Sequence, residues 1–158
     1  SEYGPDFPYD EYRREAVRLI REAAEERGIP RRPGLLPLLD HLDRLAIPFA
    51  VATSTDRETA VWKLTKAGIR DRFSALACGD EVQYGKPAPD IFLLAAERLG
   101  KSPAECTGFE DSPAGLMALQ AAGIPPVFIK DLLEPPAEVL AGVWRRYDSL
   151  DQAIELFR

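Results

Sequence analysis

The chain has 158 residues, with 26 acidic and 20 basic side chains and a net charge of −6. This length predicts one domain, and the excess of acidic residues disfavours a surface for nucleic acid or anionic membrane. The longest uncharged run, residues 112–129, is interrupted by Gly123 and a Pro pair, so we expect no membrane-spanning helix. Cys78 and Cys106 lie in separate short segments, which suggests reduced core thiols and a cytoplasmic protein.

The N-terminal part of the chain predicts a helical element of its own. A strongly charged helix is expected over residues 9–27, where apolar side chains recur at helical spacing and Gly28 supplies the stop. A Pro-rich connector follows, and the next element, over residues 35–46, is again a helix rather than a strand. We therefore predict a helical part with its connector over residues 1–30 and an α/β core over residues 31–158.

In the rest of the chain, short apolar runs alternate with helical patterns. The apolar runs predict buried strands over residues 48–53, 74–78, 106–109 and 127–129. The helical patterns cover residues 55–68, 89–99, 112–123 and a short last helix that opens at residue 149. Capping boxes at residues 55–58 and 149–152 open the first and the last of these helices. This alternation predicts an α/β fold with a Rossmann-like, mainly parallel sheet.

Polar residues follow three of the predicted strands. Thr53 and Ser54 follow the first, Lys86 lies in the loop after the second, and Glu110 and Asp111 follow the third. Ligands of open parallel sheets bind beyond the carboxyl ends of the strands, so we expect these residues to share one edge. A phosphate ester with Mg²⁺ needs such a set, because hydroxyl and amide groups bind phosphoryl oxygens, an ammonium offsets their charge, and carboxylates hold the cation.

Taken singly, these residues also fit simpler roles. The threonine fits a helix cap, the lysine a solvated loop, and the acidic pair the favourable electrostatics of a helix N-terminus. His41 lies on a predicted helix away from this edge, and we expect it at the surface. Asp80 and Glu81 form a second candidate metal site, which we rank below the first because acidic residues are common in loops.

Four segments, in their order and their amino-acid sequences, resemble the motifs of the haloacid dehalogenase-like hydrolase superfamily. The segments are Val-Ala-Thr-Ser-Thr (51–55), Gly-Asp-Glu-Val (79–82), Gly-Lys-Pro-Ala-Pro-Asp-Ile-Phe (85–92) and Phe-Glu-Asp-Ser-Pro-Ala-Gly (109–115). They are most similar to the β-phosphoglucomutase-like branch, which includes many phosphatases of small sugar phosphates and nucleotides. The resemblance extends from about residue 29 to residue 157.

The resemblance implies a role for each residue at the predicted edge. Thr53 would be the phosphate-binding hydroxyl of the second family motif, helped by the backbone N–H of Ser54. Lys86 would be the lysine of the third motif, so that Thr53 and Lys86 form the catalytic pair. Glu110 and Asp111 would be the Mg²⁺ ligands of the fourth motif.

The sequence departs from the family at its start. Family members open with an apolar strand that ends in Asp-x-Asp, whose first aspartate is the nucleophile that forms an aspartyl phosphate. Asp6 and Asp10 follow no buried strand and do not fit this motif. We therefore predict that residues 1–30 are the last part of a helical cap and that the core lacks its first strand. A slot is then expected between the strands at residues 48–53 and 106–109, and the chain as given should show little turnover.

These observations favour a Mg²⁺-dependent phosphatase that acts on a small phosphate monoester. Two alternatives stay open: a catalytically inactive phosphate-binding or regulatory module, and a sugar phosphomutase. We expect a small phosphorylated metabolite as the partner and no nucleic acid or membrane. A homo-oligomer, or pairing with another chain through an open sheet edge, also stays open. A receiver domain is disfavoured because its acidic pair comes first in the chain, and no glycine fingerprint of a nucleotide site is present.

Overall fold

A computed structural model describes residues 8–132 and 134–158, and the chain divides into two compact units, Ser1–Pro30 and Arg31–Arg158. The described part of the first unit is the helix α1 (Tyr9–Arg27) and the residues beside it. Gly28 ends this helix with a φ of 73°, and its N–H donates to the Ala24 carbonyl. That the first unit belongs to a cap stays a prediction.

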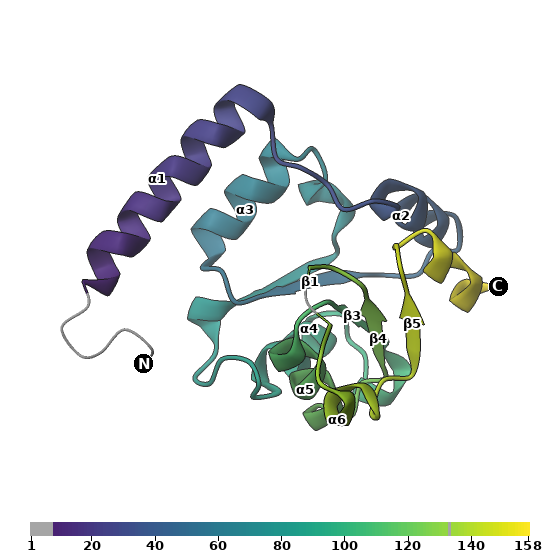
Figure 1. Ribbon diagram of the computed structural model, residues 1–158. Helices are drawn as coiled ribbons and strands as arrows, with labels where there is room; N and C mark the ends of the chain where they lie inside the picture. The colour runs from purple at the N-terminus through teal and green to yellow at the C-terminus, as the bar shows by residue number, and fades with distance from the viewer. Residues whose placement is uncertain (1–7, 133) are drawn as a thin grey trace. The chain divides into compact units, whose positions relative to one another are not determined.

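The described residues of the second unit contain five short strands, all paired in parallel. Figure 1 shows strands with helices beside them. The strands are β1 (Ala50–Thr53), β2 (Ala75–Cys78), β3 (Gly108–Glu110), β4 (Pro126–Ile129) and β5 (Arg145–Tyr147). Helices connect the strands, as parallel pairing requires. The second unit also has short 3₁₀ turns, including Gly79–Glu81 after β2 and Gln152–Phe157 near the C-terminus. The predicted α/β class with a mainly parallel sheet is confirmed.

The helices of the second unit agree closely with the sequence patterns. They are α2 (Leu35–Arg44), α3 (Arg57–Lys66), α4 (Asp90–Arg98), α5 (Pro113–Ala121) and α6 (Ala137–Leu140). Both predicted capping boxes are wrong. The Asp56 side chain caps α3 by accepting from the Thr59 N–H, and the last helix is the 3₁₀ segment, where the Gln152 side chain accepts from the Asp148 N–H. The predictions also missed α6 and β5.

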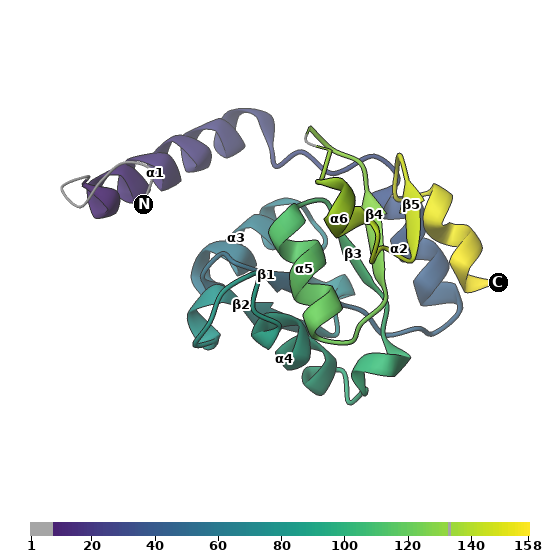
Figure 2. The ribbon, with the colours of Figure 1, turned by 60° about the horizontal axis from the view of Figure 1, so that its bottom comes forward.

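Helices cover both faces of β2. Ala77 belongs to a buried cluster with Ile91 of α4 and Leu119 of α5, whereas Leu76 and Cys78 belong to a cluster with α3. This alternation follows from the two-residue period of a strand. α4 and α5 lie side by side (Figure 2). The described helices include none that is long and apolar enough to cross a membrane.

The strands form two separate parallel sheets rather than one. One sheet contains β1 and β2, and the other has the order β3-β4-β5. The strands that end at Thr53 and Glu110 are therefore not hydrogen-bonded neighbours in the described part of the chain. A cavity of about 490 Å³ lies between them, lined by residues that include Ala50 and Ala52 of β1 and Gly108 and Phe109 of β3. This interruption agrees with the expected slot.

Candidate functional site

A lysine and a glutamate from two separate elements meet at the carboxyl ends of β1 and β3. Lys86 Nζ lies 2.6 Å from Glu110 Oε2, and the side chains of this ion pair are only 14% and 10% exposed. The ammonium also lies 3.5 Å from the Ala52 carbonyl oxygen and 4.7 Å from the centre of the Phe92 ring. Lys86 therefore bridges the ends of two strands that share no backbone hydrogen bonds.

The Glu110 carboxylate is held by the start of α5 as well as by the lysine. Its Oε1 atom accepts hydrogen bonds from the backbone N–H groups of Asp111 and Ser112 and from the Ser112 hydroxyl. Ser112 is also the N-cap of α5 and accepts from the Gly115 N–H. Burial opposes ionisation of Glu110, but the Lys86 charge and the hydrogen bonds from Lys86 and Asp111 outweigh it and lower the pKa of the carboxyl.

Gly115 allows the first turn of α5 to approach this carboxylate. A Cβ atom at residue 115 would overlap the Glu110 carboxyl group. The helix N-terminus is therefore close enough to donate to Glu110 only because position 115 carries no side chain. Sequence reasoning treated Ser112 as a cap and gave Gly115 no role of its own.

Asp111 presents a second carboxylate beside the first. Burial and the neighbouring Glu110 carboxyl raise the pKa of Asp111, and Arg32 Nη2 at 3.8 Å counteracts this only in part. Arg32 also lies 2.5 Å from Asp131 Oδ1 and donates to the Lys130 carbonyl. No residue pattern marks Arg32 as part of the site, because it lies in the connector far from every motif.

The two carboxylates fit a hard divalent cation such as Mg²⁺. Hard oxygen donors are what Mg²⁺ prefers, and it commonly uses one or two protein carboxylates. Burial and the neighbouring Glu110 carboxyl both raise the pKa of Asp111, and a bound cation would favour its charged form. Glu110 and Asp111 are the residues that would hold the ion.

Thr53 and Ser54 lie at the end of β1 where Lys86 contacts the Ala52 carbonyl. The Thr53 hydroxyl oxygen accepts from the Thr55 N–H at 3.1 Å, so it closes the turn after the strand, whereas the cap of the following helix is Asp56. A hydroxyl that accepts one hydrogen bond can still donate its proton to a ligand. Ser54 is exposed, and a Cβ at Gly79 would overlap the Ser54 backbone. The loops after β1 and β2 are therefore packed against each other.

The second candidate metal site has a structural role. Ligand atoms of Cys78, Asp80 and Glu81 lie within 4.8 Å of one another. However, Glu81 forms ion pairs with Arg57 and Arg98, each at 2.9 Å. Hydrogen bonds from these two arginines lower the pKa of Glu81 to about 2. A carboxylate that two guanidiniums already neutralise is a poor ligand for a further cation.

His41 is not the free surface residue that its helical position suggested. It is half-buried, and its Nε2 atom lies 2.9 Å from the Phe157 carbonyl oxygen. The prediction was wrong because the partner is more than one hundred residues away in the sequence. Of the two cysteines, Cys78 is fully buried and Cys106 is half-buried; burial raises the pKa of both thiols.

Comparisons with known proteins give one family. A family model described as haloacid dehalogenase-like hydrolase matches residues 3–123. The chain is 40% identical over 102 residues to hexitol phosphatase A of Escherichia coli (strain K12), a match that covers 65% of this chain and 47% of that protein. It is 41% identical over 83 residues to fructose-1-phosphate phosphatase YqaB of the same strain, covering 52% of this chain and 44% of that protein.

The fold is similar to that of a solved structure. The crystal structure of CbbY from Rhodobacter sphaeroides in complex with phosphate matches with a TM-score of 0.81 and 30% identity, over 94% of this chain and 67% of that chain. The chain therefore spans about half the length of the two phosphatases and about two thirds of the solved structure.

Proposed function

Because the chain belongs to the haloacid dehalogenase-like hydrolases, we propose that it forms most of the phosphate and Mg²⁺ site of a phosphatase for small phosphate monoesters. The observation that carries this proposal is the Lys86–Glu110 pair, which lies largely buried at the ends of two strands next to Asp111. The names of the relatives, a hexitol phosphatase and a fructose-1-phosphate phosphatase, support a phosphorylated sugar or sugar alcohol as the substrate class.

Several residues of this chain would each make a different contact with a phosphoryl group. The Thr53 hydroxyl and the Ser54 N–H would donate to phosphoryl oxygens, in the way that strand-end hydroxyl and amide groups bind phosphate. Lys86 would offset the negative charge that the transferring group carries. Glu110, fixed by the start of α5, pairs with the lysine and holds it at the strand ends. Mg²⁺, when bound by Glu110 and Asp111, would neutralise further phosphoryl charge.

The phosphoryl acceptor of the proposed reaction lies outside these 158 residues. The family resemblance implies an aspartate that ends an apolar strand, and the sequence contains no apolar strand followed by Asp-x-Asp. Covalent catalysis needs that carboxylate as its nucleophile. We therefore propose that the chain by itself binds phosphate and Mg²⁺ but turns over little substrate.

The experiment compares the chain with a version extended at its N-terminus to the length of its relatives. Phosphate release would be measured from hexitol phosphates and sugar phosphates, with Mg²⁺ and with EDTA. We expect turnover by the extended protein only with Mg²⁺, and binding of inorganic phosphate without turnover by the present chain. An extended protein that binds phosphate but releases none from any monoester would favour the regulatory module. Transfer of phosphate between two positions of a sugar would favour the mutase.

A further inference from the structure

Arg32 lies between the carboxyl ends of two neighbouring strands. Its Nη1 atom is 2.5 Å from Asp131 Oδ1, and its Nη2 atom donates to the Lys130 carbonyl at 3.2 Å. Both partners follow β4, which pairs in parallel with β3. From this position Nη2 also faces Asp111 Oδ2 at 3.8 Å, which is beyond hydrogen-bond distance. The guanidinium is therefore fixed by the end of β4 and directed at the end of β3.

This contact brings a third carboxylate close to the two proposed Mg²⁺ ligands. Burial and Glu110 raise the pKa of Asp111 most, and the negative charge of Asp131 raises it further. Within the described residues, the basic side chains that pair with these carboxylates are Lys86 and Arg32. The lysine binds Glu110 at 2.6 Å, and the arginine binds Asp131 at 2.5 Å. Asp111 is left with the longer contact to Arg32.

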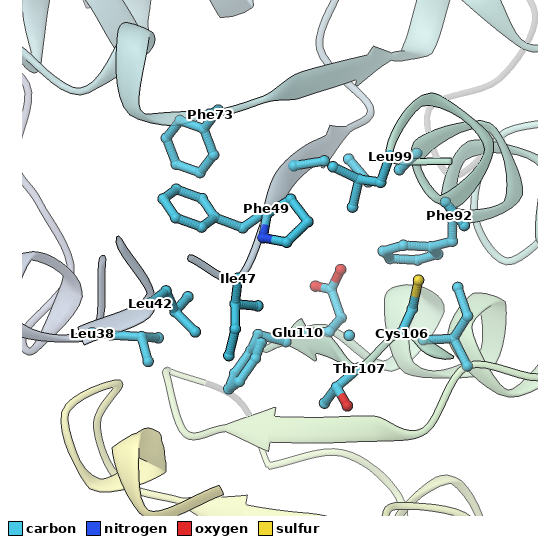
Figure 3. A pocket seen from close by; sticks show the side chains of 18 of the residues that line it. Leu38, Leu42, Ile47, Phe49, Phe73, Phe92, Leu99, Cys106, Thr107 and Glu110 are labelled. Atoms are coloured by element: carbon cyan, nitrogen blue, oxygen red, sulfur yellow. The ribbon is translucent and has the colours of Figure 1, made fainter. Parts of the chain in front are cut away.

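Solvent screens the charges of this site only in part. The Glu110 carboxylate lies in the cavity between β1 and β3, where apolar neighbours include Leu42 of α2 and Phe92 of α4 (Figure 3). Arg32 and Asp111 line the same cavity and are less than half exposed. Interactions between charges are stronger where less solvent screens them. One carboxylate more or less should therefore change the affinity for a cation measurably.

The number of carboxylates also decides which divalent cation fits. Mg²⁺ uses one or two protein carboxylates, keeps several waters and demands octahedral geometry. Ca²⁺ takes about six to eight oxygen ligands in a flexible arrangement, so it gains more from an additional carboxylate. Glu110 and Asp111 together provide the number that suits Mg²⁺. A third carboxylate within reach of the metal would shift the preference towards Ca²⁺.

We propose that Arg32 sets the cation preference of this site by binding Asp131, which withholds the third carboxylate and leaves two for the metal. Because one guanidinium contacts both Asp111 and Asp131, a cation cannot bridge these carboxylates while Arg32 stays in place. Arg32 acts through two carboxylates and is therefore a positioning residue. This inference rests on the proposed function, because it concerns the same Mg²⁺ site.

Cation affinities of substituted chains test this role. Magnesium chloride and calcium chloride would be titrated separately into the 158-residue chain. The backbone amide NMR signals of Asp111 and Ser112, which both contact Glu110, would report binding without any need for activity. We expect Arg32→Gln to raise the ratio of Ca²⁺ affinity to Mg²⁺ affinity by about tenfold or more, because Asp131 becomes available as a ligand.

Two further variants distinguish this role from a merely structural one. Arg72→Gln is the matched control, because Arg72 also bridges two aspartates, Asp40 and Asp43 of α2. It should leave the ratio of affinities unchanged. A chain that carries Arg32→Gln and Asp131→Asn together has lost the third carboxylate, and its preference for Mg²⁺ should return. A structural role of the arginine would not be rescued by removal of its partner.

Asp131→Asn alone keeps the proposal testable if Arg32→Gln does not fold. It removes the main partner of the guanidinium and leaves that positive charge facing Asp111. The affinity for both cations should then fall, on the order of threefold to tenfold, while their ratio stays the same. Unchanged affinities for both cations would contradict the proposal.

Three further outcomes would overturn it. The first is an Arg32→Gln chain with the same ratio of affinities as the unmodified chain. The second is a gain in Ca²⁺ affinity that persists in the double variant, since Asp131 would then not be the added ligand. Both leave the proposed function intact if the unmodified chain binds Mg²⁺ and Asp111→Asn weakens that binding. The third is an unmodified chain that binds no Mg²⁺, which would remove the proposed Mg²⁺ site as well.

Discussion

Glu81, just after β2, and Glu110, the last residue of β3, are both carboxylates that form ion pairs, but their surroundings differ in charge. Glu81 lies between two guanidiniums, and its cluster joins α3, α4 and the backbone of β2. Glu110 has a single lysine and stands next to a second carboxylate, Asp111. In the first cluster two guanidiniums face the Glu81 carboxylate, whereas in the second the carboxylates of Glu110, Asp111 and Asp131 face only Lys86 and Arg32. An ion-paired carboxylate therefore fits a cation site where carboxylates outnumber their basic partners.

The largest expected effect is a loss of activity on removal of the lysine that pairs with Glu110. In a version of the protein that turns over substrate, Lys86→Ala should lower kcat by about 10²–10³, the usual result of losing one preorganised electrostatic contact. Lys101→Ala is the matched control, because Lys101 also pairs with a glutamate but is 43% exposed. Steady-state kinetics on both variants measure the difference. Equal kcat values for Lys86→Ala and the unmodified protein would remove the lysine from the mechanism.

A smaller effect, on stability, is expected when a side chain is added between the start of α5 and Glu110. Gly115→Ala places a Cβ where the Glu110 carboxyl lies, and overpacking of this kind costs about 1–3 kcal/mol. Gly85→Ala is the control, because a Cβ there has no neighbour within 4 Å. Denaturant unfolding should show a lower midpoint for Gly115→Ala alone. Similar midpoints for the two variants would contradict the close approach of α5.

The Glu81 cluster should make stability depend on acid pH. The folded pKa of Glu81 is lowered to about 2 by its arginines, so its contribution is present above the unfolded pKa near 4.3 and lost as the pH falls from about 5 to about 2. Because the partners are partly exposed, we expect this contribution to be about 1–2 kcal/mol. Glu81→Gln should flatten the unfolding free energy over this range. An unchanged pH profile would show that the cluster adds no stability.

The smallest change in stability is expected at Asp111. Its folded pKa is raised, so the charged form is disfavoured by folding above the unfolded pKa, and Asp111→Asn should unfold at the same Tm or slightly higher at neutral pH without metal. The same substitution should weaken Mg²⁺ binding about tenfold or more, because ligand charge sets affinity. Isothermal titration and thermal unfolding measure the two effects. A lower Tm with unchanged Mg²⁺ affinity would contradict both parts.

Local signals in the sequence determined most of the helices, the strand ends and the meeting of Lys86 with Glu110. Ser112 before a proline predicted the start of α5, and the structure shows its cap to Gly115. The motifs placed a lysine and an acidic pair after separate strands, and parallel pairing brings such strand ends to one edge. These features depend on neighbouring residues in the chain or on strand direction. Both can be inferred from residue patterns.

Only the tertiary structure decided which charges are neutralised and where the sheet is open. β5 was missed because its arginines are exposed and its pairing with β4 uses the backbone, which leaves no pattern of side chains. Arg32, His41 and the arginines of Glu81 acquire their partners from distant segments. The slot between β1 and β3 was an expectation from family resemblance, but its apolar walls come from α2 and α4. Contacts between segments far apart in the chain depend on packing, which local sequence patterns do not encode.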